Sequence, residues 1–536
     1  MGERYTDEER AVLARHFSDV DDDVFALVDL PEVVKGALFA RYSRSPKSLR
    51  RLFLDEFAGD LAALQAELGR DADVGLGRAD ELYQRVFNEY GDDSVAQLGG
   101  AHVAVENLSN LMTKQLEWGR LAAYLEQSTR YIAYDDKPDG RYRYYRDPDV
   151  MAGPHAAAYV ATMDAIFDTY AELVPEMLSW VRERWPRDDA TSDFVYRNAT
   201  KAKALDLLRG LLPAATTSNV GMFASGQSYE NLLLRLRASG LAEARHVGDR
   251  LLTELRTLIP AFLTRVDRED RGLAWSDYLA TTAAATRANG AALLPDVTPQ
   301  PSGLVTLSDW WPRDPRDAEI ELCTAILYAV ADRPEGQLRA EVRRFTDEER
   351  ARVIRDYVGE RANRRHKPGR AFERVWYRFD VLGDYGGFRD LQRHRMLTIE
   401  WQDLTTRHGY ETPAELEEAG VADRWRRALA RSAELYERLL PDHPQQAQYA
   451  VCFAFRVRYV MQLNARAAMQ MLELRSTPQG HPQYRAVVQR MHDHIRDTAG
   501  HRLVAEAMSH VDHGGAELER LESERAAERR RAAAGR

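Results

Sequence analysis

Cationic and titratable side chains gather at one point of this sequence, in a setting that suits the binding of an anion. The stretch "LQRHRMLTIEWQ" places Arg393, His394 and Arg395 side by side, with apolar residues between Met396 and Trp401 directly after them. Guanidinium groups offer paired donors that match phosphate oxygens, and an imidazole donates or accepts according to its protonation. The triplet suits a phosphorylated ligand with an aromatic ring, although two arginines paired with surface carboxylates would have the same sequence.

Composition restricts what kind of protein could carry such a site. The chain has 536 residues, more than one hydrophobic core normally supports, with 44% hydrophobic and 29% charged residues. The net charge of −10 argues against a general nucleic-acid binder, and no apolar run reaches the length of a membrane span. Cys323 and Cys452 are isolated, which argues against a disulfide framework or a zinc ribbon. We expect a cytoplasmic protein that binds neither nucleic acid nor membranes.

Helical periodicity dominates the chain, and a predicted linker divides it into two long parts. Strand patterns are fewer: "RYIAY" at residues 130–134, "LVTLSDWW" at 304–311 and "AVCFAFRVRYVM" at 450–461. Residues 287–303 collect Pro, Gly, Asn and Ser, which predicts a linker between a first part, 1–286, and a second, 304–515. The charged tail, 516–536, has no broad apolar face and is expected to be a frayed helix or disordered.

A short sequence occurs twice, as "YTDEERA" from Tyr5 to Ala11 and as "FTDEERA" from Phe345 to Ala351. Thr followed by acidic residues is typical of a helix N-cap, because its hydroxyl and the carboxylates satisfy the free N–H groups of the first turn. We therefore predict two helix starts here, rather than homologous repetition of these two stretches.

The motif around the triplet is divided between the two parts of the chain. The first part has Trp118-Gly119-Arg120 and then Glu126-Gln127-Ser128-Thr129-Arg130-Tyr131, whereas the second part keeps Arg-His-Arg and then departs at Glu400, Asp403 and Thr405. "LLRGLLPAATT" in the first part contains Arg209, and "QLNARAAMQMLELRS" in the second contains Asn464, Arg466 and Arg475. We expect Trp118 to be a core residue.

These segments resemble the motifs of the flavin-dependent thymidylate synthases. That family has R-H-R-x-x-S-x-N-x-x-S-x-R, a Gln three residues before R-H-R, L-P with a preceding Arg, and an N-x-R helix that ends in a second Arg. The order and spacing match twice along this chain, with complementary losses. The resemblance implies an α+β, predominantly helical fold made of two tandem copies, each with helices packed on a small, mainly antiparallel sheet.

The resemblance also implies an activity and a site. It implies reductive methylation at C5 of dUMP, or a related uracil nucleotide, with FAD as cofactor and with NADPH and methylene-tetrahydrofolate as co-substrates. One composite site per chain would survive, with Arg475 at the pyrimidine carbonyls as a catalytic residue. The nucleotide-binding residues implied are Gln115, Glu126, Ser128, Arg130, Arg209 and Arg475, and the FAD-binding residues implied are Arg393, His394, Arg395, Asn464 and Arg466.

Two further expectations follow, one from the family's tetrameric assembly and one from the motif residues that each copy lacks. Two chains with four copies would form a homodimer that acts as a pseudo-tetramer. The losses leave a second functional class open, a non-catalytic FAD- or nucleotide-binding paralogue with a regulatory or assembly role.

Histidines cluster near the end of the second part. A metal site is conceivable, but no ordered ligand motif is present, so we favour a solvated helix face and predict no metal. The residues are His492, His494, His501, His510 and His513.

Overall fold

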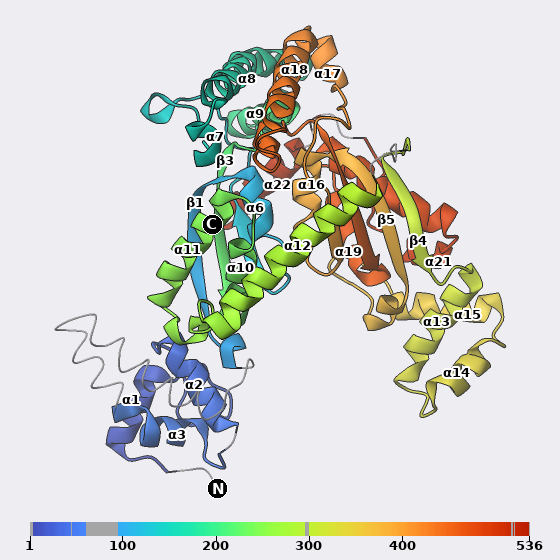
Figure 1. Ribbon diagram of the computed structural model, residues 1–536. Helices are drawn as coiled ribbons and strands as arrows, with labels where there is room; N and C mark the ends of the chain where they lie inside the picture. The colour runs from blue at the N-terminus through green and yellow to red at the C-terminus, as the bar shows by residue number, and fades with distance from the viewer. Residues whose placement is uncertain are drawn as a thin grey trace. The chain divides into compact units, whose positions relative to one another are not determined.

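The structure is a computed structural model and describes residues 4–43, 45–59, 95–294, 300–515, 518 and 520–534 (Figure 1). It divides into two compact units. Unit 1 comprises Met1–Glu106, Gly119–Glu126 and Asn219–Val297, and unit 2 comprises Asn107–Trp118, Gln127–Ser218 and Thr298–Arg536. No helix in the described ranges is both long enough and apolar enough to cross a bilayer.

Unit 1 contains a three-stranded sheet in the order β1-β3-β2, with β2 antiparallel to β3. β1 is Gly100–Ser109, β2 is Ala122–Glu126 and β3 is Thr217–Ser225, so β1 and β3 contribute residues to both units. Its main helices are α1 Asp7–His16, α2 Glu32–Tyr42, α3 Leu49–Glu56, α10 Gly226–Arg237, α11 Ala242–Arg256 and α12 Ala274–Leu293.

Unit 2 contains a four-stranded antiparallel sheet in the order β4-β5-β7-β6. In the central strands β5 and β7, buried residues alternate with partly exposed ones, as expected when one face packs on a core. The strands are β4 Val305–Trp311, β5 Trp376–Asp384, β6 Thr398–Trp401 and β7 Arg456–Asn464.

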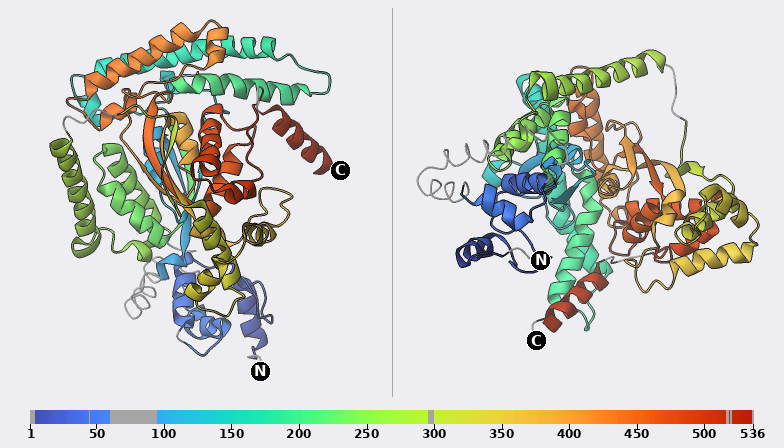
Figure 2. Two further views of the ribbon diagram at one scale, coloured as in Figure 1. Left: turned by 90° about the vertical axis from the view of Figure 1, so that its right-hand side faces the viewer. Right: turned by 90° about the horizontal axis from the view of Figure 1, so that it is seen from below.

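Helices of unit 2 come from both parts of the sequence. The long helices α8 and α18 pack side by side, and α22 packs against α9 (Figure 2). The helices are α6 Asn110–Leu116, α7 Pro148–Ala152, α8 Ala156–Arg184, α9 Asp193–Leu208, α13 Pro315–Tyr328, α14 Glu335–Val342, α15 Asp347–Val358, α16 Tyr385–Leu391, α17 Ala414–Glu418, α18 Ala422–Leu439, α19 Ala465–Arg475, α20 Pro482–Asp493, α21 Arg502–Ala507 and α22 Leu521–Ala534.

The order of elements repeats along the chain, which confirms the predicted α+β, predominantly helical fold. Strand β1 leads into α6 through the N-cap Ser109, and β5 leads into α16 through the N-cap Asp384. In the same way Ser225 joins β3 to α10, and Asn464 joins β7 to α19. Each N-cap side chain accepts a backbone N–H of the first turn, so the polar residue between strand and helix fixes the same corner four times.

Equivalent positions of the two copies contact each other inside unit 2. Pro213 and Cys452 each stand four residues before a repeated strand, and they form an antiparallel bridge. Tyr385 and Asn110 each begin a repeated helix, and the Tyr385 hydroxyl donates to the Asn110 carbonyl at 2.8 Å. Contact between equivalent residues is expected around a local pseudo-twofold axis. The compact units therefore do not coincide with the copies 1–286 and 304–515.

Several local expectations can be compared with the observed elements. Both predicted N-caps are confirmed, because Thr6 with Glu9 and Thr346 with Glu349 form complete capping boxes. Residues 304–311 contain β4 as predicted, but "RYIAY" is a turn because the N–H groups of Tyr131 and Ile132 both donate to the Ser128 carbonyl.

The remaining differences concern the boundaries of elements. The predicted strand at 450–461 begins only at Arg456, because the backbone before it bonds to residues 210–214 instead. Helix α12 continues to Leu293, into the segment expected to be a linker. The tail, expected to be a frayed helix or disordered, contains helix α22, on which Arg525 pairs with Asp188 at 2.7 Å and Glu528 accepts from Ser192.

Candidate functional site

Arg130 is a buried cation held by a buried carboxylate in unit 2. Its Nε donates to Asp206 at 2.6 Å, Nη2 lies 2.5 Å from the second oxygen, and Nη1 donates to the Tyr484 hydroxyl at 3.2 Å. Burial raises the pKa of Asp206, but the charge and hydrogen bonds of Arg130 outweigh burial and lower that pKa to about 2. The Ser128 hydroxyl accepts the Arg130 N–H at 3.2 Å and so sets the turn that presents Arg130.

A second buried carboxylate, Asp390 at the end of α16, collects three guanidinium groups. Arg393 lies 3.2 Å from it, Arg475 lies 3.5 Å and Arg209 lies 3.6 Å. Burial raises the pKa of Asp390, and the three arginines lower it well below its usual range. Asp390 thus joins Arg209 of the first copy to Arg475 of the second.

Arg475 also contacts the histidine of the triplet. Its Nε donates to Nε2 of His394 at 2.9 Å. Burial, and next the charge of Arg475, lower the pKa of His394 to about 3, so the ring is neutral at pH 7. Because Nε2 accepts, the single proton of the neutral ring is on Nδ1.

His394 is therefore expected not to titrate between pH 5 and 8. In nitrogen-edited NMR of histidine-labelled protein, we expect its Nδ1–H tautomer throughout that range. A His394 signal that moves with a midpoint near 6.5 would contradict this geometry.

The cluster carries more positive than negative charge. Among the described residues, the four arginines Arg130, Arg209, Arg393 and Arg475 face the three aspartates Asp206, Asp384 and Asp390. When all are ionised, the formal charge is +1. Buried charge of one sign is costly unless it is compensated, so this cluster is suited to an anionic ligand.

Arg209 provides the clearest unused donor in the cluster. The residue is buried, and within the described ranges its Nη2 meets no hydrogen-bond partner. A Cβ at Gly386 would lie 3.3 Å from that nitrogen, so glycine permits this close approach. Arg209 also lines a cavity of about 280 Å³ with Lys203, Asp384, Arg456, His481 and Gln483, which gives space for a small ligand beside the donor.

Asp384 combines two roles next to this cavity. Its Oδ1 accepts the Gly387 N–H at 2.6 Å as the N-cap of α16. Burial raises the pKa of Asp384 to about 6, and the charge of Arg209 and the Gly387 hydrogen bond oppose that rise only in part. The native state therefore binds this proton more tightly than the unfolded chain does.

Substituting Asp384→Asn is expected to stabilise the protein at high pH. Asn keeps the cap acceptor and removes the buried charge, so unfolding should cost about 2 kcal/mol more at pH 8. The gain should shrink as pH falls through 6 and vanish below about 4, where the carboxyl is protonated in both states. Urea unfolding across pH measures it.

The exposed N-cap Asp314 of α13 is the matched control for this substitution, because it makes the same kind of cap. Asp314→Asn should change the unfolding free energy by less than about 0.5 kcal/mol at every pH. An Asp384→Asn effect that is equally small and independent of pH would contradict the raised pKa.

The other residues of the predicted FAD set lie at the opposite end of α19 or at the surface. Arg395 is exposed, Asn464 caps α19, and Arg466 donates to the Pro368 carbonyl at 3.0 Å. Lys367 lies near Arg466 and His394, and burial together with the charges of Arg466, Arg364 and Arg361 lowers its pKa. A concentration of cations that depresses a lysine pKa fits the phosphates of a dinucleotide cofactor.

The predicted nucleotide set also includes two residues near the ends of elements in the first copy. Gln115 is half-buried on α6 of unit 2, and Glu126 is buried at the end of β2 in unit 1. Trp118, expected in the core, is 46% exposed and meets Trp401 edge-on with ring centroids 5.7 Å apart.

Sequence reasoning missed the two carboxylates that organise the cluster. Asp390 stands three residues before Arg-His-Arg, at the position that Gln115 holds before Trp-Gly-Arg, so the alignment of the two copies could have identified it. Asp206 precedes Arg209 by three residues at the end of α9, the spacing at which helical side chains share a face. No motif or spacing in the sequence indicated Tyr484, whose hydroxyl accepts from Arg130.

The histidine cluster is not the solvated helix face that we expected. His492 and His501 are buried, and His501 contacts the Tyr377 hydroxyl at 2.9 Å and the Pro312 carbonyl at 3.0 Å. His510 donates to the Arg361 carbonyl at 3.1 Å, and Nδ1 of His492 lies 2.9 Å from Nε2 of His513. These contacts join helices near the C-terminus because imidazoles can satisfy buried carbonyls.

Comparison with known proteins identifies the family. The profile of the family described as thymidylate synthase complementing protein matches residues 40–261 and 307–499. The chain belongs to this family. The two matched segments agree with a tandem, two-copy form of the thymidylate synthase complementing protein, as the repeated strand–helix order also indicates.

Relatives extend over nearly the whole length of this family member. A UPF0159 protein of Chlamydia pneumoniae is 38% identical over 494 residues, covering 90% of this chain and 91% of its own. A UPF0159 protein of Thermoplasma acidophilum is 30% identical over 516 residues, covering 91% and 97%. A solved structure of a UMP/dUMP methylase from Streptomyces cacaoi bound with 5-Br dUMP covers 38% of this chain and 94% of its own, at 19% identity and a TM-score of 0.30.

Proposed function

We propose that this chain is an FAD-dependent, thymidylate synthase-like methyltransferase with one composite site. It would methylate dUMP, or a related uracil nucleotide, at C5 with methylene-tetrahydrofolate and NADPH. The observation that carries the proposal is the 2.9 Å hydrogen bond from Arg475 to His394, because it joins the nucleotide residues to the flavin residues. Asp390 extends the connection to Arg209 of the other copy.

The arginines would divide the nucleotide between them. Arg130 and Arg209 would hold the 5′-phosphate, since forked donors and the unused Nη2 of Arg209 suit phosphate oxygens. Gln115, Glu126 and Ser128 would complete the nucleotide contacts that family membership implies. Arg475 would face the pyrimidine carbonyls and stabilise the negative charge that makes C5 nucleophilic.

Neutral His394 would orient Arg475 without adding a competing charge. Arg393, His394, Arg395, Asn464 and Arg466 would hold FAD, with Lys367 near its phosphates. Bound FAD would accept hydride from NADPH and mediate the transfer and reduction of the methylene group, so the side chains supply position and electrostatics.

A non-catalytic FAD- or nucleotide-binding paralogue is a second candidate function. The observation that favours it is Asp390, a carboxylate at the position that holds Gln115 in the first copy, which already neutralises part of the arginine cluster. In such a protein, ligands would stabilise the fold without turnover.

Purified protein distinguishes the two candidates. The enzyme proposal predicts retained FAD, with its yellow absorbance, and NADPH oxidation that requires a uracil nucleotide and methylene-tetrahydrofolate. FAD retention without NADPH consumption would favour the paralogue, and a colourless protein that does neither would overturn the enzyme proposal.

Association of two chains is expected in solution. Unit 1 exposes apolar side chains on its edge strand and nearby: Leu125 is 81% exposed, Leu121 74% and Phe223 43%. Burying such a surface stabilises an interface, so sedimentation should give twice the 61.0 kDa chain mass.

Leu125→Glu should shift this equilibrium toward single chains. Val330→Glu alters a residue that is also 81% exposed, on unit 2, and should leave the mass unchanged. A wild-type protein that sediments as one chain at micromolar concentration would contradict the predicted homodimer.

A further inference from the structure

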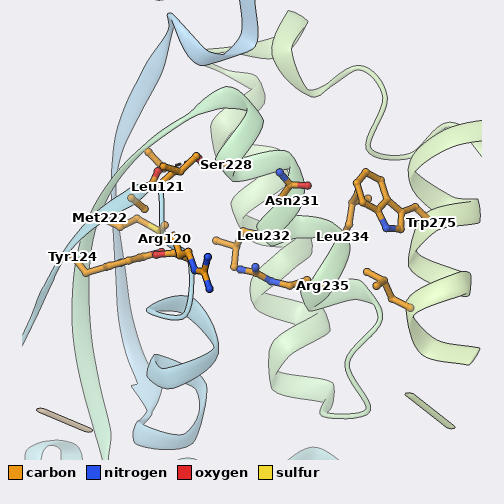
Figure 3. Close-up of a pocket in the computed structure, with 14 residues that line it drawn as sticks. Arg120, Leu121, Tyr124, Met222, Ser228, Asn231, Leu232, Leu234, Arg235 and Trp275 are labelled. Carbon is orange, nitrogen blue, oxygen red and sulfur yellow. Dashed lines mark hydrogen bonds between the residues drawn. The ribbon is translucent and has the colours of Figure 1, made fainter. Parts of the chain in front are cut away.

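Two histidines and an aspartate of unit 2 place their potential metal-ligand atoms within 4.8 Å of one another. They are His492 and Asp493 at the end of α20, and His513 in the segment 508–515 that follows α21. Among the described residues, no other group of three or more His, Cys, Asp or Glu side chains does so. The cavity of unit 1 in Figure 3, by comparison, is lined by none of these four residue types. Ligand atoms gathered in this way are the first requirement for a metal site.

His492 is a buried histidine whose two ring nitrogens have different partners. Its Nε2 lies 3.2 Å from the Ala505 carbonyl, which can only accept, so Nε2 carries the proton of the neutral ring. Nδ1 therefore has a free lone pair, and it lies 2.9 Å from Nε2 of His513. Histidines that bind metals nearly always donate their other ring N–H to a carbonyl or carboxylate, which orients the ring. His492 already has this arrangement.

The backbone on both sides of His513 is held by α20. The Gln489 amide donates to the Asp512 carbonyl at 2.9 Å, and Nη2 of Arg485 donates to the Gly514 carbonyl at 2.8 Å. A side chain whose backbone is already fixed loses little further freedom when it binds a ligand. The fold thus holds His513 beside His492 independently of any bound ion.

Asp493 can supply a third ligand without leaving a neighbouring cation unpaired. One of its oxygens lies 3.9 Å from Nδ1 of His513 and 3.1 Å from Nη2 of Arg496. Arg496 also donates to both oxygens of Asp497, at 2.9 and 2.7 Å, and so keeps a bidentate partner when Asp493 binds an ion. The side chains of Asp493 and His513 are 31% and 40% exposed, which gives an ion and its bound water access from solvent.

We propose that His492, Asp493 and His513 bind a divalent transition-metal ion, for which zinc is the best match. Two imidazole nitrogens and one carboxylate oxygen suit zinc, whereas magnesium and calcium prefer oxygen ligands alone. The ion takes the place of the proton between the two rings, and that proton moves from Nε2 to Nδ1 of His513. Bound zinc fastens the segment 508–515 to α20. The proposal does not rest on the methyltransferase function.

This site replaces the expectation of no metal, which was based on the absence of an ordered ligand motif in the sequence. His492 and His513 are 21 positions apart, and the fold brings their ring nitrogens to 2.9 Å. Closely spaced ligands on one helix can be recognised from sequence, but a pair joined by the packing of a distant segment cannot.

Zinc binding tests the proposal in the full-length protein. After EDTA has been used to remove bound metal and has itself been dialysed away, titration calorimetry with Zn²⁺ at pH 7 compares the wild type with His513→Ala and Asp493→Asn. His513→Ala should bind one equivalent per chain fewer, or bind it at least about 100-fold more weakly, because even contacts outside the ligand set change metal affinity by 10- to 100-fold. Asp493→Asn should weaken binding at least about tenfold. Both side chains are partly exposed, so neither change removes a core contact.

The exposed His246 on α11 of unit 1 provides the matched control, because His246→Ala removes a surface histidine and should leave zinc binding unchanged. Equal zinc stoichiometry and affinity in the wild type and His513→Ala would overturn the proposal. A loss in His246→Ala as large as that in His513→Ala would overturn it too, since binding would then be a general property of surface histidines.

NMR of histidine-labelled wild-type protein gives a readout that needs no variant. One equivalent of Zn²⁺ should shift the ring-nitrogen signals of His492 and His513 and leave those of His246 in place, and millimolar Mg²⁺ should not compete. Zinc that binds without moving the His492 and His513 signals, or that Mg²⁺ displaces, would contradict the assigned ligands.

Discussion

Replacing Arg475 with glutamine is expected to lower kcat/KM for methylation of the uracil nucleotide by about 10²- to 10³-fold, the usual effect of removing one donor to a developing negative charge. The glutamine amide would keep some hydrogen-bonding capacity but lose the charge that faces Asp390 and the Nε–H that His394 accepts. Arg475→Lys should lie in between, because an ammonium keeps the charge without the planar fork. Steady-state rates and nucleotide affinities measure both effects.

Arg237 is the matched control for Arg475, because it ends α10 as Arg475 ends α19. In unit 1, Arg237 donates to the Val266 carbonyl at 3.1 Å and lies 3.6 Å from Asp249. Arg237→Gln should leave both activity and nucleotide affinity within about twofold of the wild type. Equal losses for the two arginines would mean that both copies keep a nucleotide site, and the single composite site would be wrong.

Replacing Asp206 with asparagine is expected to destabilise the fold by about 3–5 kcal/mol at pH 7, because it leaves the buried Arg130 guanidinium without its counter-charge. The lowered pKa of Asp206, about 2, sets the pH window. The contribution of ionised Asp206 to the free energy of unfolding is fully present above about pH 4, the pKa of Asp in the unfolded chain, and is lost as pH falls through 2. The difference in unfolding free energy between wild type and variant should therefore narrow only below pH 4.

Asp193 on the same helix provides the control for Asp206. It pairs with Arg197 at 3.2 Å, but both side chains are 63% exposed, so Asp193→Asn should cost less than about 0.5 kcal/mol. Urea unfolding with FAD and nucleotide absent measures both variants. A loss for Asp206→Asn no larger than that for Asp193→Asn would mean that Arg130 is solvated and that the buried pair does not organise the cluster.

The fold class could be predicted from the sequence because its signals are local. Helical periodicity, the Thr-Asp-Glu-Glu caps and the spacing of the repeated motifs each involve residues within one turn or one strand–helix corner. Residues 130–134 were predicted to form a strand from their local alternating pattern, but they form a turn. Their alternating pattern buries Tyr134 as a strand would, while the Ser128 carbonyl accepts two successive N–H groups and curls the backbone.

The composite site could be predicted only in part, because its connections are long-range. The motifs singled out Ser128, Arg130, Arg209, His394 and Arg475, and the structure places all five in unit 2. Asp390 replaces the Gln that the motif would have there, Asp206 belongs to no recognised motif, and the Arg130–Asp206 pair spans 76 positions. The interleaving of the copies rests on backbone bonds such as Ala214 to Val451 at 2.8 Å, which no periodicity reveals.

In the first copy, Trp118 and Gly119 replace the first Arg and the His of the Arg-His-Arg triplet. The glycine changes the side-chain packing at this position. Where Gly119 replaces the histidine, the side-chain space is shared by Tyr124 and Arg235 of unit 1. In the second copy the same position supplies His394, which orients Arg475. The proposed methylation site therefore uses residues of both copies, but only the second copy keeps the histidine that contacts Arg475.

Methylation of a uracil nucleotide at the arginine cluster of unit 2, with the aid of FAD, can be observed in a single reaction. The most direct measurement is mass spectrometry of the nucleotide after dUMP is incubated with FAD-loaded protein, NADPH and methylene-tetrahydrofolate carrying a labelled methylene carbon. We expect a product that has gained one labelled methyl group, formed by the wild type and by Arg237→Gln and nearly absent with Arg475→Gln. Unchanged dUMP and UMP, from protein that retains FAD and both nucleotides, would contradict it.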